Sequence, residues 1–138
     1  MKRITLKGHS ASKGIAEGEA LVTEDMIGFS NDVDVMTGII HEPTFGAKGE
    51  CVAGKVLVFP MTRGSTGGPY GLYMLWKAGN APKAIVNVEA DGIGVAGAVI
   101  SHTPMVYRLD QNPMEVIETG DYVIVDASQG IVEVIKKP

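Results

Sequence analysis

The chain has 138 residues, of which 45% are hydrophobic and 20% are charged, a balance typical of a globular domain. Its formal net charge is −4, and no run of lysine and arginine offers a surface for nucleic-acid phosphates. A single cysteine excludes an internal disulfide and a thiolate cage around a metal. No apolar stretch reaches the ~20 residues of a membrane span, and the first residues lack the apolar segment of a signal peptide. We therefore expect a cytoplasmic protein, a single domain over residues 1–138 that binds neither nucleic acid nor membrane.

Short apolar runs and 18 glycines predict a β-rich chain with many tight turns. Residues 4–7 and 20–23 predict short strands on either side of a glycine-rich connection. Residues 24–48 are polar, contain glycine and proline, and show no sustained period. We expect this segment to be a long surface loop with a short strand near residues 37–41, and loops of this length are often functional.

The middle of the chain predicts a strand, a helix and a second strand. Residues 55–59 form a largely apolar run that ends at Pro60, the pattern of a strand buried on both faces. A helix is expected over residues 69–78, since proline begins it and Gly79 follows it. Residues 83–88 predict the second buried strand. In this order the three elements form a parallel βαβ unit.

The last third of the chain predicts three more strands. They are expected over residues 97–101, 121–126 and 131–135, the last two joined by a Ser-Gln-Gly turn. The fold class predicted from the residues is therefore α/β, a β-rich domain with few short helices.

The residues best suited to chemistry follow the strand over residues 55–59. Arg63, Gly64, Ser65 and Thr66 come between the carboxyl end of that strand and the amino end of a helix, where open α/β sheets bind ligands. A helix N-terminus favours an anion, and a guanidinium matches a carboxylate or a phosphate. Ser65 or Thr66 could instead simply cap the helix, which is the commoner use of such residues. The convergence of four suitable residues favours a binding site.

A serine in this setting is better suited to act as a base than as a nucleophile. A nucleophile would need a histidine or lysine partner, and no histidine lies near Ser65 in the sequence. The spacing of the glycines around Ser65 also differs from the Gly-x-Ser-x-Gly elbow. An arginine and a helix N-terminus would, however, stabilise the alkoxide of a serine that accepts a proton.

Three blocks of sequence resemble a known family. They are residues 54–60 (Gly-Lys-Val-Leu-Val-Phe-Pro), residues 63–66 (Arg-Gly-Ser-Thr) and residues 79–86, with Gly, Ala-Pro and Ala-Ile-Val in matching places. Together they resemble the small subunit of the aconitase X type dehydratases. The resemblance implies a swivelling β/β/α domain with a barrel-like core. It also implies a heterodimer with a large subunit that binds a [4Fe–4S] cluster, which a chain with one cysteine cannot bind itself.

The resemblance assigns roles to individual residues. Ser65 matches the catalytic serine of the family, the base that removes a proton next to the substrate carboxylate. Arg63, Gly64 and Thr66 would bind a small, anionic, phosphorylated substrate of archaeal isoprenoid synthesis, and no residue of this chain would bind a metal. A hydroxyproline dehydratase has the same architecture and is the alternative. Where the family often has a Gly-Gly-Val-Asp-Pro-like stretch, residues 31–35 are Asn-Asp-Val-Asp-Val, so Asp34 would be the matching acid.

His102 supports a rival hypothesis. Residues 119–126, with Gly130 after them, resemble the phosphohistidine swivelling domain of phosphoenolpyruvate-using enzymes, in which a histidine carries a phosphoryl group. That family places its histidine in a Gly-Gly-rich turn before a helix of small residues, whereas Pro104 closely follows His102. A histidine at the end of a strand, satisfied by hydrogen bonds, is the commoner outcome. A third hypothesis is a non-catalytic binding domain in which Ser65 only caps a helix.

Overall fold

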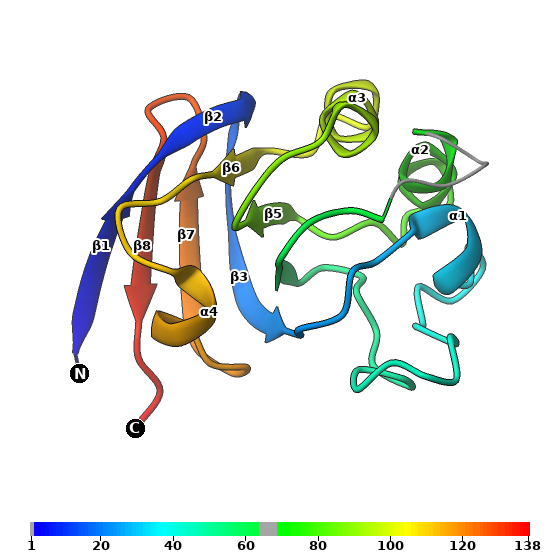
Figure 1. Cartoon of the computed structure of the whole chain (residues 1–138), viewed down its shortest axis with the longest axis horizontal. Coiled ribbons are helices and arrows are strands. Elements are labelled where there is room, and N and C mark those ends of the chain that lie inside the picture. The colour runs from blue at the N-terminus through cyan, green and yellow to red at the C-terminus, as the bar shows by residue number, and fades with distance from the viewer. Residues whose placement is uncertain (1, 64–68) are drawn as a thin grey trace.

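The computed structural model describes residues 2–63 and 69–138 (Figure 1). In this part of the chain eight strands form a mixed sheet in the order β1-β8-β7-β3-β4-β5-β6-β2. The strands are β1 (Arg3–Lys7), β2 (His9–Ser12), β3 (Ile15–Val22), β4 (Val56–Phe59), β5 (Ala84–Asn87), β6 (Met105–Tyr107), β7 (Tyr122–Asp126) and β8 (Ile131–Ile135). The helices are α1 (Phe29–Asp32), α2 (Tyr70–Lys77), α3 (Gly92–Ile100) and α4 (Pro113–Val116).

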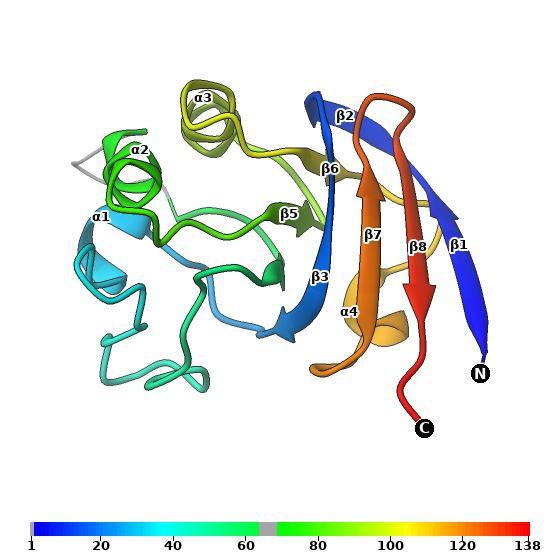
Figure 2. The ribbon, with the colours of Figure 1, turned by 180° about the vertical axis from the view of Figure 1, so that it is seen from behind.

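The sheet bends into two layers with a barrel-like cross-section. The two outermost strands in the order, β1 and β2, are consecutive in the chain and are separated only by Gly8. The first layer is antiparallel and consists of β1, β8, β7 and β3. The second layer continues from β3 through the parallel strands β4, β5 and β6 to the antiparallel β2. Helices α1, α2 and α3 lie on the outer side of the second layer (Figures 1 and 2).

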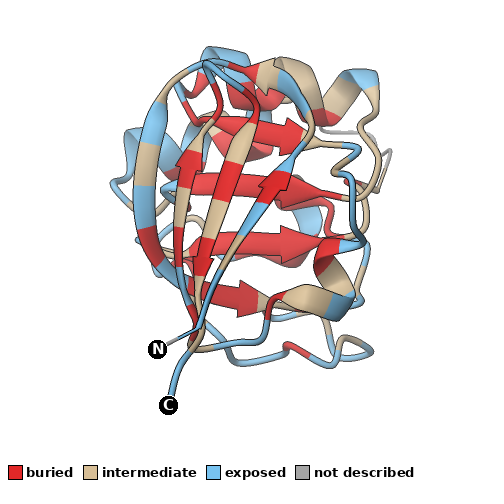
Figure 3. Ribbon diagram, turned by 90° about the vertical axis from the view of Figure 1, so that its left-hand side faces the viewer, coloured by how far each residue is buried: buried red, intermediate tan, exposed pale blue. Residues whose placement is uncertain are grey.

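The burial pattern follows from this three-layer arrangement. Strands β4 and β5 are buried at every position because they have a strand layer on one side and helices on the other (Figure 3). Strands β7 and β8 alternate between buried and more exposed residues, since one of their faces meets solvent. One core lies between the two strand layers, and a second core, containing Phe29, Leu57, Phe59, Leu72 and Ile85, lies beneath the helices.

The predicted α/β fold class and the parallel strand-helix-strand unit are confirmed. Strand β4, helix α2 and strand β5 coincide with the three predicted elements to within about one residue at each end, and β4 pairs with β5 in parallel register. The two C-terminal strands were also predicted correctly as β7 and β8. None of the helices in the described residues is long and apolar enough to cross a bilayer.

The strand predicted over residues 97–101 is wrong, because these residues end helix α3. Asp91 caps that helix by accepting a hydrogen bond from the Gly94 backbone N–H at 3.1 Å. Gly97 allows the close approach of α2, since a Cβ there would lie 3.3 Å from the Pro69 carbonyl oxygen. The small and apolar residues that allow α3 to pack closely were therefore misinterpreted, in the sequence, as a buried strand.

The segment over residues 24–48 is more structured than the predicted surface loop. It contains α1, and Ile27, Phe29 and Ile40 are buried in the core beneath the helices. The strand expected near residues 37–41 is reduced to isolated bridges at Ile39 and Ile40. Strands β2 and β6 and the first half of β3 were not predicted, since their sequences are short or contain glycine and polar residues.

Candidate functional site

The candidate site lies at the carboxyl edge of the parallel strands. Parallel pairing of β3, β4, β5 and β6 brings their carboxyl ends to the same edge of the sheet. Thr62 and Arg63 follow β4 at this edge, and Asp91, the cap of α3, follows β5. This edge is where open α/β sheets bind ligands, as the sequence indicated.

Arg63 is held in place by a buried carboxylate. Its Nη2 donates hydrogen bonds to both Asp32 oxygens, at 2.7 Å to Oδ1 and 2.9 Å to Oδ2. The Asp32 side chain is 1% exposed and the Arg63 side chain 43% exposed. Asp32 Oδ2 also accepts the Gly28 backbone N–H at 2.7 Å, and the Arg63 backbone N–H donates to the Ile27 carbonyl at 3.0 Å. The loop that carries Arg63 is thus attached by its backbone to Ile27, just before α1, and by its side chain to Asp32, the last residue of α1.

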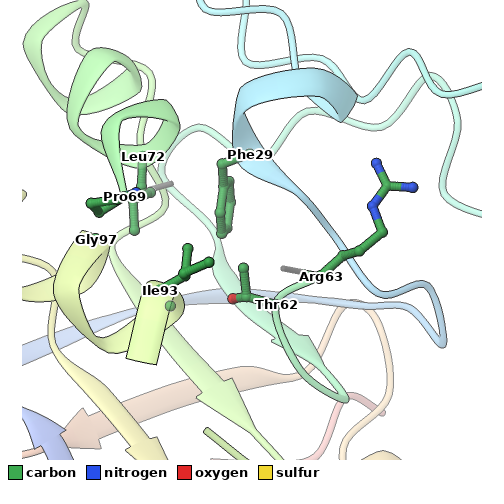
Figure 4. A pocket seen from close by; sticks show the side chains of 8 residues that line it. Phe29, Thr62, Arg63, Pro69, Leu72, Ile93 and Gly97 are labelled. Atoms are coloured by element: carbon green, nitrogen blue, oxygen red, sulfur yellow. The ribbon is translucent and has the colours of Figure 1, made fainter. Parts of the chain in front are cut away.

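A small hollow lies beside Arg63, between three helices (Figure 4). The hollow is lined by Phe29 of α1, Pro69 at the N-cap of α2, Leu72 of α2, Ile93 of α3 and Thr62. Its volume of about 10 Å³ is enough for about one water molecule. The Arg63 side chain points away from Thr62 and Ile93, toward the end of α1 that carries Asp32. The hollow is therefore mostly apolar, and the guanidinium charge lies at its edge.

The predicted residues Gly64, Ser65 and Thr66 lie outside the described residues, so their roles remain predictions. Pro69 occupies the N-cap of α2, and its own side chain makes no capping hydrogen bond. Ser65 and Thr66 precede that position by three residues or more in the sequence. The capping alternative for Ser65 and Thr66 therefore stays a prediction as well.

Two further groups at the carboxyl edge were missed from the sequence. Asn87 ends β5 and is fully buried, and its Nδ2 donates to the Phe59 carbonyl at 3.0 Å, while its Oδ1 has no partner among the described residues. Glu89 pairs with Arg108 at 2.9 Å on the surface. The hydrogen bond from Arg108, helped by the Ala90 backbone N–H, lowers the pKa of Glu89 below its ordinary value.

Asp32 is the more important omission. The resemblance pointed to Asp34, but Asp34 is exposed and its Oδ1 accepts the nearby Met36 backbone N–H, at 2.9 Å. Asp32 is the acid that reaches the candidate site. The only signal in the sequence was an aspartate between two apolar residues that turn out to be buried, Phe29 and Val33. A pattern of this kind is too weak to identify an ion pair with a residue 31 positions away.

His102 lies far from this edge in the topology. It follows α3 and precedes β6, at the amino ends of the parallel strands, whereas Arg63 follows the carboxyl end of β4. Its exposed ring packs on Trp76, with ring centroids 4.9 Å apart. His102 and Arg63 therefore do not form one site.

Metal ligands do not gather in the described part of the chain. Among residues 2–63 and 69–138, no group of three His, Cys, Asp or Glu side chains is placed to hold a metal ion. Cys51 is a free, partly buried thiol whose Sγ lies 3.4 Å from the Thr37 carbonyl oxygen.

The fold and the site define a swivel domain of the aconitase type, with a β/β/α arrangement and an arginine-bearing loop at the edge of its parallel strands. The chain belongs to the aconitase X swivel domain family, which matches residues 5–134. It is therefore an enzyme subunit of the hydro-lyase class, and the predicted family is confirmed. The phosphohistidine-carrier hypothesis loses its support, since it required another family.

Individual relatives are similar over nearly the whole chain. The phosphomevalonate dehydratase small subunit of Methanosarcina acetivorans is 46% identical, over 99% of this chain and 94% of the relative. The protein of the same name from Methanocella arvoryzae is 48% identical, over 93% of this chain and 97% of the relative. The crystal structure of Thermococcus kodakaraensis aconitase X in its holo-form has 42% identity and a TM-score of 0.90, covering 96% of this chain and 99% of that chain.

Proposed function

We propose that this chain is the small subunit of a phosphomevalonate dehydratase. The enzyme would convert (R)-5-phosphomevalonate to trans-anhydromevalonate 5-phosphate, with loss of water, in archaeal isoprenoid synthesis. The observation that carries the proposal is the 46–48% identity, over at least 93% of this chain, to archaeal relatives of that name. The position of Arg63 beside a hollow at the carboxyl edge supports it, since the substrate carries a carboxylate and a phosphate.

The proposal divides the active site between two chains. A large subunit would bind a [4Fe–4S] cluster, which would supply Lewis-acid chemistry for the departure of the hydroxyl group. Such a cluster needs several thiolates, and this chain has one cysteine. This chain would act as a single cytoplasmic domain over residues 1–138 and contribute the base and an anion-binding arginine.

Ser65 is the proposed base. As an alkoxide, its Oγ would accept the proton from the carbon next to the substrate carboxylate. The electron pair of that C–H bond would form the new carbon-carbon double bond, and the hydroxyl on the neighbouring carbon would depart. The proton held by Ser65 and the departing hydroxide together make up the one water lost for each substrate, and release of that proton would restore the alkoxide. The positive charge of Arg63, two residues away in the sequence, would favour the alkoxide over the neutral hydroxyl.

Arg63 is the proposed anion-binding group, with Gly64 and Thr66 beside it. Its Nη2 is engaged by Asp32, but Nε and Nη1 make no hydrogen bond to any residue that the structure describes. These N–H groups would remain available to a carboxylate or phosphate oxygen. Asp32 would fix the guanidinium in one orientation before substrate arrives, which lowers the entropic cost of binding.

Anaerobic reconstitution with the large subunit tests the proposal. (R)-5-phosphomevalonate and hydroxyproline are supplied in parallel reactions, and the products are identified by mass spectrometry. We expect phosphomevalonate to lose water only when both chains are present. The proposal is wrong if a complex forms and hydroxyproline, rather than phosphomevalonate, is dehydrated.

A further inference from the structure

The outer surface of α2 and α3 carries exposed apolar side chains and almost no charge. Five large apolar side chains are exposed on these helices, and we call them the α2–α3 face: Tyr70, Met74 and Trp76 of α2, and Val99 and Ile100 of α3. The nine residues of α3 include no charged residue, and α2 has only Lys77, at its end. A fifth of the whole chain is charged, so this composition is unusual for a surface.

The side chains of the two helices form one continuous surface. The helices lie side by side in the outer layer (Figures 1 and 2) and approach closely at Gly97, where a Cβ would lie 3.3 Å from the Pro69 carbonyl oxygen. The Trp76 ring bridges them, with its centroid 4.9 Å from that of His102 and 5.8 Å from that of Tyr73. The α2–α3 face therefore presents its apolar groups together.

Such a surface is costly to leave in water. Burying apolar surface in an interface is favourable because it removes that surface from water. Tyrosine, tryptophan and methionine are the residue types enriched at the centres of protein–protein interfaces. The opposite outer surface, on the antiparallel layer, contrasts with it, because exposed Glu17 and Glu19 and the ion pair between Arg3 and Glu133 lie there. The charged side is suited to solvent, and the α2–α3 face is suited to a partner.

The position of the face indicates which partner. Pro69 and Leu72 line the hollow beside Arg63, so the first turn of α2 borders both the candidate site and the α2–α3 face. A chain that completes an active site at Arg63 must approach this edge of the molecule. Because α2 borders that edge, the same chain would cover the outward side of α2.

We propose that the α2–α3 face is the docking surface for the large subunit, which contributes a complementary, weakly charged apolar surface. The inference rests on the proposed function, since that function supplies the second chain. Docking on this face would bring the partner over Arg63, with the substrate enclosed between the two chains.

The test uses two pairs of matched variants of the full chain with the isolated large subunit. Tyr70→Glu places a charge on the α2–α3 face, and Tyr122→Glu places one on an exposed tyrosine of the antiparallel layer. Val99→Glu and Ile15→Glu form the second pair, since both side chains are more than half exposed. Circular dichroism and thermal melting confirm that each variant folds. Affinity for the large subunit is measured by titration calorimetry.

We expect Tyr70→Glu and Val99→Glu to weaken binding about tenfold or more, and the two control variants to stay within about twofold of the unmodified chain. Trp76, the only tryptophan in the chain, should lose access to acrylamide when the large subunit binds. Equal effects of all four variants, or no effect of the two on the face, would overturn the proposal. The proposal would also be overturned if two copies of this chain bound each other through the α2–α3 face while the large subunit did not bind.

The outcome separates this inference from the proposed reaction. Tight binding that depends on Tyr70 and Val99, without dehydration of phosphomevalonate, would remove the substrate assignment and leave the docking surface standing. Dehydration of phosphomevalonate by a complex whose affinity is insensitive to both substitutions would remove the docking surface and leave the substrate assignment standing.

Discussion

Replacing Asp32 by asparagine tests whether a buried carboxylate holds the arginine of the candidate site. Asp32 accepts hydrogen bonds from Arg63 at 2.7 and 2.9 Å and from the Gly28 backbone N–H at 2.7 Å. Asparagine has nearly the same shape but no charge, and its amide nitrogen must face one of these donors. We therefore expect Asp32→Asn to loosen Arg63 and to reduce the stability of the fold.

The size of the effect follows from the burial of the two partners. Removing one partner of a fully buried ion pair costs about 3–5 kcal/mol, and a hydrogen bond to a charged group contributes about 1.5–3 kcal/mol. Arg63 is 43% exposed, so water can solvate its charge once Asp32 is gone. We expect a loss of about 2 kcal/mol, which for a chain of this length lowers Tm by about 6–10 °C.

The assay combines calorimetric melting of the isolated chain with steady-state kinetics of the reconstituted enzyme. Asp34→Asn is the matched control, because Asp34 is exposed and its carboxylate accepts a local backbone N–H. We expect its Tm to change by about 2 °C or less, whereas Asp32→Asn should also raise KM for an anionic substrate. A Tm and a KM that are the same for Asp32→Asn and Asp34→Asn would refute the reasoning.

Two other predictions concern the fold. At Gly71, which packs against α1, a Cβ would overlap the Ser30 backbone nitrogen. Gly71→Ala should therefore lower the free energy of unfolding by about 1–3 kcal/mol, measured by denaturant titration. Gly92→Ala is the control and should not destabilise the fold, because a Cβ at Gly92 would have no neighbouring atom within 4 Å. Burial alone would raise the pKa of Asp121, but hydrogen bonds from Lys136 and two backbone N–H groups outweigh it and lower that pKa, while the same pairing raises the pKa of Lys136. The stabilisation by Asp121 is thus complete above its unfolded pKa of about 3.9 and is lost as pH falls through its lower folded pKa. The stabilisation by Lys136 is complete below its unfolded pKa of about 10.4 and is lost as pH rises through its higher folded pKa. Melting of Asp121→Asn against pH should show a deficit that shrinks below about pH 4, and a constant deficit would contradict this.

The parts of the fold that the sequence predicted are those with a strong local pattern. Strands β4 and β5 are continuous apolar runs between two layers, and α2 has proline at its start and glycine beyond its end. Helix α3 was mistaken for a strand because Gly94 and Gly97 are present for close packing, which is a property of neighbours far along the chain. Strand β6 is three residues long, too short to show a period.

The candidate site divides in the same way. Arg63 was identified because it lies in a local signal, a strand followed by glycines and a helix. Asp32 and Asn87 were missed because their roles depend on partners that only the tertiary fold brings near, Arg63 and the Phe59 carbonyl. The parallel register of β4 and β5 places Asn87 opposite Phe59, and the packing of α1 brings Asp32 to Arg63, so no single segment of the sequence indicates either contact.

Ser65 is the proposed base of a two-chain dehydratase. Its most direct test is the dehydration of (R)-5-phosphomevalonate by complexes that contain either the unmodified chain or Ser65→Ala, with affinity for the large subunit and for the substrate measured on the same samples. A positioned general base typically contributes 10²–10⁴-fold, so we predict that Ser65→Ala keeps both affinities and loses turnover by about that factor. Turnover within about threefold of the unmodified complex would contradict the claim.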